Sequence, residues 1–157
     1  MTGVIVREYT EEDAAAFRDL NLAWVEAFFT VEAEDRAQLE DPQTHILDPG
    51  GAILIAEYNG EAVGTAGLVP GHGEGVLELI KMSARTDVQG KGIGRALMEA
   101  AIEKSRDMGA AQIWLETNTK LAAALALYRK VGFRELTGDE VTPTPYDRCN
   151  CQMLLDL

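Results

Sequence analysis

Hydrophobic and polar residues follow one another along the chain in two distinct rhythms, which predict its elements. A period of two residues, or a short continuous apolar run, is typical of a β-strand, whereas a spacing of three and four residues is typical of a helix. Strands are expected at residues 4–8, 52–58, 61–69, 76–84, 111–117, 133–136 and 149–155. Helices are expected at residues 11–22, at 24–39 with a break, at 92–108, and between Thr119 and Gly132.

The order of these elements requires both kinds of strand pairing. Asn59-Gly60 is the favoured pair for a two-residue hairpin turn, which makes the strands on either side of it antiparallel. In contrast, residues 76–117 contain a strand, a glycine-rich turn, a helix and a strand, the pattern of a parallel crossover unit. The sequence therefore predicts one α/β domain over residues 1–157, with a mixed sheet of six or seven strands.

Composition excludes several classes of protein. With 46% hydrophobic and 25% charged residues, the chain is globular rather than disordered. It has no run of the ~20 apolar residues that a membrane helix needs and no basic, apolar leader at its N-terminus. We therefore expect a soluble, cytoplasmic protein with no membrane partner. The net charge of −12 also works against a nucleic-acid partner.

Charge is distributed unevenly along the sequence. Residues 1–78 hold three basic and 16 acidic side chains, whereas residues 79–157 hold 11 basic and ten acidic ones. An anionic ligand is therefore expected to bind to the second half. A metal site is not expected, because the two histidines are isolated and Cys149 and Cys151 lack the spacing of a zinc motif.

Three glycines in alternate positions, Gly90, Gly92 and Gly94, mark the start of the helix predicted at 92–108. Glycine lets the backbone approach a ligand closely, and the free N–H groups of a helix start favour an anion, so this loop is a candidate phosphate site. The charged residues between positions 81 and 95 are Lys81, Arg85, Lys91, Arg95 and one acid, Asp87. A tight turn with solvated cations is the alternative interpretation of this segment.

Two common nucleotide motifs are absent from this loop. A Walker loop needs Ser or Thr after Gly-Lys, but Gly92 follows Lys91, so ATP or GTP hydrolysis is disfavoured. The dinucleotide fingerprint fails because Arg95 occupies the place of its last glycine. Other phosphate-bearing cofactors remain.

The segment resembles the GNAT family of acyl-CoA N-acetyltransferases. Gln89, Gly92 and Gly94 match its signature Q/R-x-x-G-x-G/A, with a strand before the signature and a helix after it. The second motif of that family matches ALALYRKVGF at residues 124–133. One departure is Leu121, where many members carry Asn. The resemblance implies a mixed, mostly antiparallel sheet of six or seven strands flanked by about four helices.

This resemblance also implies acetyl-CoA as the acyl donor, with no metal. The end of the strand at 76–84 should pair with the pantetheine arm, and the glycine loop should hold the pyrophosphate. The cofactor-binding residues so implied are Met82, Ser83, Ala84, Gln89, Gly90, Lys91, Gly92, Ile93, Gly94 and Arg95. Tyr128 matches the tyrosine often proposed to protonate the departing thiolate. The alternative is that Tyr128 only completes the apolar stripe of its helix.

An amine must lose a proton before it attacks a thioester, so a carboxylate in apolar surroundings is a candidate base. Glu78 shares its strand face with apolar residues and is the expected base, acting directly or through water. Pairing of Glu78 with a nearby Arg or Lys is the alternative. An acyl-cysteine step is discounted, because Cys149 and Cys151 have no evident histidine partner.

The acceptor pocket is expected between the first helices and the loop before the last strand. Its expected residues are Trp24, Glu26, Phe29, Tyr146 and Arg148. Acidic helices would attract a cationic amine and Arg148 could hold a carboxylate, which favours an amino acid or a similar small zwitterion as the acceptor. Polyamines, protein N-termini and lysines are alternative acceptors, and a non-catalytic acyl-CoA-binding domain is the rival function. Formation of a homodimer stays open.

Overall fold

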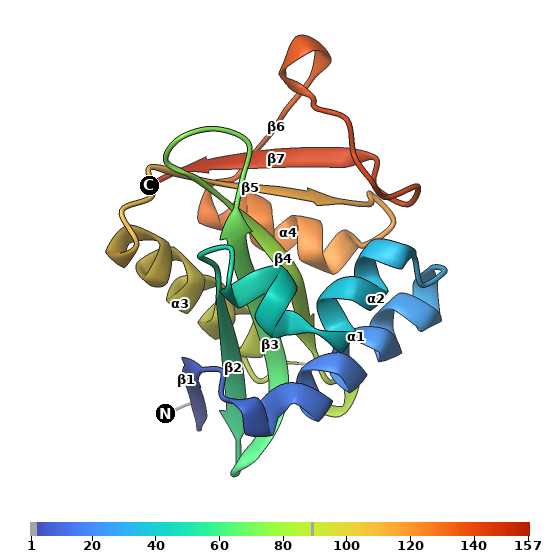
Figure 1. The fold of residues 1–157 in the computed structure, drawn as a ribbon, viewed down its shortest axis with the longest axis vertical. Coiled ribbons are helices and arrows are strands. Elements are labelled where there is room, and N and C mark those ends of the chain that lie inside the picture. Colours follow the sequence, from blue (N-terminus) through green and yellow to red (C-terminus); the bar gives the residue numbers. More distant parts are fainter. Residues whose placement is uncertain (1–2, 89) are drawn as a thin grey trace.

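The computed structural model describes residues 3–88 and 90–157, and its elements follow the predicted order (Figure 1). The strands are β1 (Val4–Glu8), β2 (Ala52–Tyr58), β3 (Glu61–Pro70), β4 (Val76–Ala84), β5 (Gln112–Thr117), β6 (Arg134–Glu135) and β7 (Cys151–Asp156). The helices are α1 (Ala14–Phe28), α2 (Ala33–Glu40), α3 (Ile93–Asp107) and α4 (Ala122–Val131). Short helical turns lie at Glu11–Asp13, Gln43–Leu47, Thr86–Val88 and Gly138–Glu140.

These strands form one seven-stranded sheet in the order β1-β2-β3-β4-β5-β7-β6. The pair β4–β5 is parallel, and the other five pairs are antiparallel. α3 connects β4 to β5, because parallel neighbours need a crossover connection. The predicted mixed, mostly antiparallel sheet is therefore confirmed.

The turn between β2 and β3 is the predicted hairpin. Asn59 and Gly60 have φ angles of 53° and 80°, so both central residues adopt the left-handed conformation that a type I′ turn needs. Tyr58 pairs with Glu61 directly across this turn. The Asn-Gly pair thus sets the register at which the two strands begin to pair.

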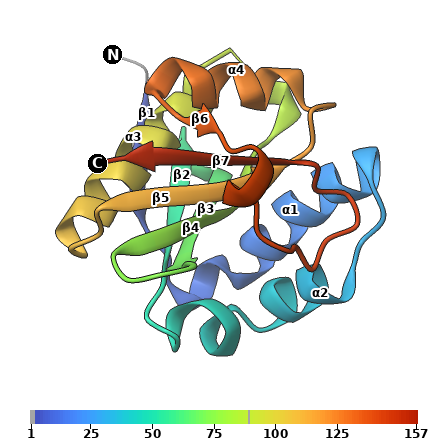
Figure 2. The same cartoon turned by 90° about the horizontal axis from the view of Figure 1, so that it is seen from above.

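The helices cover both faces of the sheet (Figures 1 and 2). α3 and α4 pack on one face, where the larger core includes Leu97, Met98 and Tyr128. α1 and α2 pack on the other face, where a smaller core includes Phe17 and Leu39. Figure 2 shows the two pairs of helices on opposite sides of the strands.

The N-terminal helices differ from the prediction. α1 runs without a break, because Phe17, Asn21 and Val25 form one continuous buried stripe. α2 is a separate helix that begins after Glu32, whose backbone N–H donates to the carboxylate of Asp35 (2.9 Å). The aromatic segment around Trp24 is therefore the end of the first helix rather than the start of the second.

The C-terminal strands are shorter than predicted. β6 has two residues, and β7 begins at Cys151 rather than at Cys149. The side-chain amide of Asn118 donates to the carbonyl of Arg148 (2.6 Å), which holds residues 143–150 in a loop beside the end of β5. This loop becomes part of the site described below.

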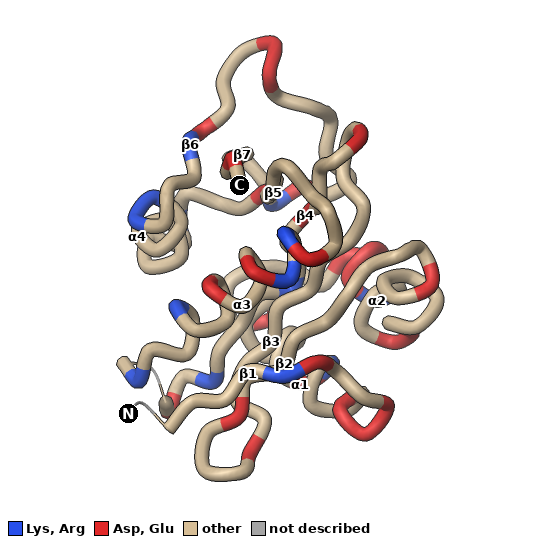
Figure 3. The backbone as a smooth tube through the Cα atoms, turned by 90° about the vertical axis from the view of Figure 1, so that its left-hand side faces the viewer, with Lys and Arg blue, Asp and Glu red and all other residues tan. Residues whose placement is uncertain are grey.

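Acidic residues are frequent in the N-terminal third of the chain. They gather along α1, α2 and the segments that flank these helices (Figure 3). Among the described residues, no helix is both long and apolar enough to cross a bilayer.

Candidate active site

The candidate active site is a cavity of about 770 Å³ at the place where β4 and β5 separate. These two strands pair only over Val76–Glu78 and Gln112–Trp114. Beyond Glu78, β4 keeps its pairing with β3, while its other edge faces the cavity. A concave, largely apolar space between elements is typical of a ligand site.

The glycine loop forms part of the cavity wall. The loop residues that line it are Gly90, Gly92, Ile93 and Gly94, while Gln89 lies outside the described residues. Gly90 and Gly92 have φ angles of 85° and 79°, and no atom lies within 4 Å of the place that a Cβ would take at either residue. The N–H of Ala96 donates to the carbonyl of Gly92 (3.0 Å), so the N–H groups of residues 93–95 have no acceptor inside α3. These groups are available to an anion.

Two of the four cations between positions 81 and 95 bind acidic side chains away from this loop. Lys81 is buried, and its ammonium group binds Asp35 on α2 (2.5 Å). Arg85 pairs at the surface with Asp87 (2.6 Å) and Glu61 (2.9 Å). An anion at the loop would therefore depend mainly on backbone N–H groups.

Two expected cofactor ligands lie outside the cavity wall. Lys91 and Arg95 are both exposed, and neither lines the cavity. Arg95 pairs with Glu99 one turn further along α3 (3.0 Å). Both residues are sequence neighbours of glycines that line the cavity, so their side chains could contact only a part of the ligand that lies outside it.

The end of β4, where a pantetheine arm is expected to pair, also borders the cavity. Met82, Ser83 and Ala84 all line the cavity. The hydroxyl oxygen of Ser83 is buried and has no hydrogen-bond partner among the described residues. A buried hydroxyl without a partner is unfavourable, so this group is suited to a polar ligand.

A β-bulge at Lys81 shapes this strand. The pairing shifts from Gly67–Ile80 to Thr65–Ser83, and Lys81 has a φ of 51°. Such a bulge re-aims a side chain, and here the ammonium group of Lys81 reaches Asp35 instead of the glycine loop.

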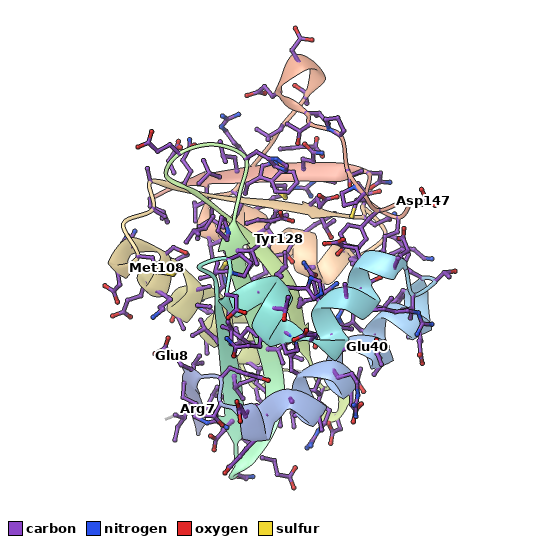
Figure 4. All side chains as sticks on the ribbon, in the orientation of Figure 1. Arg7, Glu8, Glu40, Met108, Tyr128 and Asp147 are labelled. Carbon is purple, nitrogen blue, oxygen red and sulfur yellow. The ribbon has the colours of Figure 1, made fainter. Side chains whose placement is uncertain are left out.

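Tyr128 lies on α4 and lines the cavity. Its ring packs against Phe133 at 5.8 Å between centroids, and its hydroxyl has no hydrogen bond to a described residue. Burial raises the pKa of Tyr128 to about 12, so the phenol stays protonated at neutral pH. In Figure 4, Tyr128 lies inside the molecule, away from the outer loop that carries Asp147.

Glu78 is the last residue of β4 that pairs with β5, and it also lines the cavity. Burial raises the pKa of Glu78 to about 7, with further increases from the negative charges of Glu116 and Glu34, against the opposing charge of Lys81. No described residue forms an ion pair or a hydrogen bond with its carboxylate. The alternative interpretation, in which Glu78 pairs with an Arg or Lys, is therefore not seen among the described residues.

The part of the cavity where the acceptor is expected, called here the acceptor side, combines aromatic residues at the end of α1 with the loop before β7. Its lining residues there are Trp24, Phe28, Phe29, Tyr146, Arg148 and Cys149. Lys120 donates to the carbonyl of Phe28 (3.2 Å) and lies 5.1 Å from the ring centre of Phe29, which ties α1 to the segment before α4. Glu26 is exposed and does not line the cavity, so the structure does not bring it to the site.

Arg148 and Lys81 share one carboxylate, that of Asp35. Nη1 and Nη2 of Arg148 lie 2.6 and 2.7 Å from the two oxygens of Asp35, which is fully buried. Burial alone would raise the pKa of Asp35, but the hydrogen bonds from Arg148 and the charge of Lys81 lower it to about 2. Arg148 also stacks on Tyr146, with 4.4 Å to the ring centre. The guanidinium expected to hold a substrate carboxylate is thus already occupied.

Four cavity or near-cavity residues have roles that the sequence did not reveal. They are Asp35, Lys81, Glu116 and Cys149. Lys81 could have been recognised from the sequence, because it interrupts the apolar pattern of β4. A buried cation needs a buried partner of opposite charge, which here is Asp35. The thiol of Cys149 faces Glu116, and burial together with this carboxylate raises its pKa, which disfavours a reactive thiolate.

Comparisons with known proteins agree with this geometry. Residues 14–133 match the Acetyltransferase (GNAT) family. The uncharacterized N-acetyltransferase YjgM of Escherichia coli (strain K12) is 31% identical over 160 residues, which cover 98% of this chain and 95% of that protein.

Solved structures share the fold. An acetyltransferase of the GNAT family from Staphylococcus aureus Mu50 superposes with a TM-score of 0.87 at 23% identity, covering 98% of both chains. The structure of yncA from Salmonella typhimurium with its cofactor acetyl-CoA gives a TM-score of 0.73 at 20% identity, covering 98% of this chain and 94% of that one. The chain belongs to the GNAT family and is an acyl-CoA-dependent N-acetyltransferase.

Proposed function

We propose that the enzyme transfers an acetyl group from acetyl-CoA to a primary amine of a small molecule, by direct attack while both substrates are bound. The observation that carries this proposal is that Glu78, Tyr128 and the glycine loop line one cavity where β4 leaves β5. A base, an acid and an anion-binding loop are the groups that such a transfer needs.

Residues of β4 and the glycine loop would hold the cofactor. The unpaired N–H groups at the start of α3 suit a pyrophosphate, and the open space beside Gly90 and Gly92 lets it approach the backbone. The buried hydroxyl of Ser83 and the unpaired edge of β4 beside it suit the amides of a pantetheine arm. When bound, acetyl-CoA supplies an acetyl group activated as a thioester.

Glu78 is the proposed base. A carboxyl whose pKa is about 7 is half ionised at neutral pH, so it can take a proton from an ammonium group within its reach. Glu78 does so directly or through one water, and its lack of an ion-pair partner leaves it available. The amine is then a nucleophile, which its protonated form is not.

Tyr128 is the proposed acid. Its hydroxyl is protonated at neutral pH and bonds to no described residue, so it can donate to the sulfur atom of the departing thiolate. Burial on α4 against Phe133 holds the ring in one position.

The acceptor is proposed to be a small molecule. Lys120 links α1 to the segment before α4, and the loop 143–150 packs against α2 through Arg148, so the walls of the acceptor side are tied to each other. An amino acid as the acceptor loses its main support. Arg148 is the residue expected to hold the carboxylate of the amino acid, but its guanidinium already binds Asp35.

The test is release of free thiol from acetyl-CoA with a panel of primary amines, with the acetylated product identified by mass spectrometry. We expect amine-dependent thiol release that Glu78→Gln and Tyr128→Phe reduce. Binding of acetyl-CoA without acetylation of any amine in the panel would overturn the proposal.

A further inference from the structure

Two cations at the acceptor side of the cavity, the buried Lys81 and the partly buried Arg148, are already neutralised. Arg148 holds both oxygens of Asp35, and Lys81 binds one of them. Glu32 adds a second carboxylate, 3.3 Å from Nη1 of Arg148. A substrate carboxylate could bind Arg148 in bidentate fashion only by displacing Asp35, which would leave a fully buried charge with a weakened set of partners.

Carboxylates outnumber cations around this side of the cavity. The acids are Glu32, Glu34, Asp35, Glu78 and Glu116. The cations are Lys81, Lys120 and Arg148, which all line the cavity. Asp35 and Glu32 neutralise Lys81 and Arg148, so Glu34, Glu78 and Glu116 are left against Lys120. The local field is therefore negative, and a field of this sign concentrates cations and repels anions.

Two of these acids line the cavity itself and influence each other. Glu78 on β4 pairs with Trp114 on β5, and Glu116 lies two residues further along β5. The charge of Glu116 contributes to the raised pKa of Glu78, so the two carboxylates are close enough to interact. One cation between them would relieve this repulsion.

Apolar surface lines the same cavity as Glu78 and Glu116. Trp24, Phe28 and Phe29 provide aromatic surface against which an alkyl chain can pack.

From this arrangement we propose that the acceptor is an alkyl diamine, with one amino group at Glu78 and the other cation held by Glu116, and that Asp35 makes the site reject carboxylates. This inference rests on the proposed acetyl transfer and specifies its acceptor class. Asp35 acts through Arg148 and is therefore a positioning residue for specificity.

Three amines of matched length test the proposal on the native enzyme. They are 1,5-diaminopentane, pentylamine and 5-aminopentanoate, compared by kcat/KM for thiol release at saturating acetyl-CoA. We expect the diamine to be preferred over both, by about tenfold or more over the aminopentanoate, because like charges placed together in a site cost several kcal/mol.

The outcomes separate this inference from the proposed function. If 5-aminopentanoate equals or exceeds the diamine, or if other amines are acetylated while the diamine is not, the diamine proposal is wrong and acetyl transfer stands. If no amine of a wide panel is acetylated, the proposed function fails and the diamine proposal with it.

Two variants locate the selectivity. Glu116→Gln keeps an oxygen that can accept from Thr144 but removes the charge, so the preference for diamine over pentylamine should fall by about tenfold or more. Glu26→Gln is the matched control, because it removes one exposed carboxylate outside the cavity and should leave this preference unchanged. An equal loss in both variants would contradict a local role for Glu116.

Asp35→Asn tests the rejection of carboxylates. It removes the charge that holds Arg148 in bidentate fashion, so KM for 5-aminopentanoate should fall while KM for pentylamine changes little, and Asp35→Glu should restore the native preference. If Asp35→Asn does not fold, the comparison of the three amines and the Glu116→Gln variant still decide the proposal.

Discussion

The hydroxyl of Thr65 donates a hydrogen bond of 2.7 Å to the carbonyl oxygen of Lys81, at the bulge that turns β4 beside the cavity. Thr65 in turn accepts from the side-chain amide of Asn21 (3.0 Å), which also accepts from the indole N–H of Trp24 (3.2 Å). A chain of hydrogen bonds thus runs from the aromatic wall of the cavity, through the buried face of α1, to the bulge. Lys81 has a positive φ, which costs a non-glycine residue about 1–3 kcal/mol, so the bulge needs such support.

Thr65→Val should destabilise the protein and slow catalysis together. The substitution keeps the shape but leaves the Lys81 carbonyl and one N–H of Asn21 without their partner, which costs about 1–3 kcal/mol in free energy of unfolding. We expect kcat to fall more than KM for acetyl-CoA rises, because the bulge lies between Glu78 and the end of β4. Chemical denaturation and steady-state kinetics measure the two effects.

Ser105→Ala is the matched control for Thr65→Val. Ser105 is also buried and donates to the carbonyl of Ala101 (2.7 Å), but it lies on α3 and does not line the cavity. The Ser105→Ala variant should have a lower free energy of unfolding than the native enzyme but the same kcat. If Thr65→Val likewise keeps the native kcat, the hydrogen bond supports only the fold.

Gly92→Val should weaken coenzyme A binding strongly. A valine places its side chain in the space that a pyrophosphate would enter, and it also strains a residue whose φ is 79°. Gly109→Val is the matched control, because Gly109 has a φ of 83°, equally open surroundings and a position outside the cavity. Calorimetric titration with coenzyme A should show a large loss only for the Gly92 variant. Equal affinity in both variants would remove the loop from the cofactor site.

Most of the fold follows from local sequence, and its boundaries show the limit of that approach. β4 spans Val76–Ala84 as predicted, since its two apolar rows suit a strand between neighbours on both sides. The turn at Asn59-Gly60 is equally local. The start of β7 is not, because the contact of Asn118 with the carbonyl of Arg148, 30 residues away, decides where the loop ends.

The same distinction applies to the site. The motifs around Gly92 and Tyr128 predict residues that line one cavity, because each motif lies within a few consecutive positions. The direction of Lys81 depends on a bulge and on Asp35, 46 residues earlier in the chain, so the strand pattern alone places its charge wrongly. The pairing of Arg148 with Asp35 has the same origin, because the two partners are 113 positions apart in the sequence.

Tyr128→Phe should reduce turnover without destabilising the protein. The hydroxyl has no hydrogen bond to a described residue, so its removal should leave the free energy of unfolding unchanged or slightly higher. Loss of a positioned acid should lower kcat about 10²- to 10⁴-fold, while coenzyme A affinity persists. Native turnover in this variant would mean that Tyr128 has only a packing role on the apolar face of α4.

Glu78→Gln should change the pH dependence of both activity and stability. With the pKa of Glu78 raised from 4.5 to about 7, kcat/KM for the amine in the native enzyme should rise as pH passes through about 7, and the variant should lose this inflection along with most of its activity.

The raised pKa also means that the folded state binds a proton more tightly than the unfolded one. Its stabilising effect is complete below pH 4.5 and is lost as pH rises through 7. Denaturation at pH 5 and pH 8.5 should therefore show a smaller loss of stability for Glu78→Gln than for the native enzyme. An unchanged inflection in the pH–rate profile would exclude Glu78 as the base. A lost inflection with unaltered stability profiles would mean that the pKa of Glu78 is raised only once acetyl-CoA is bound.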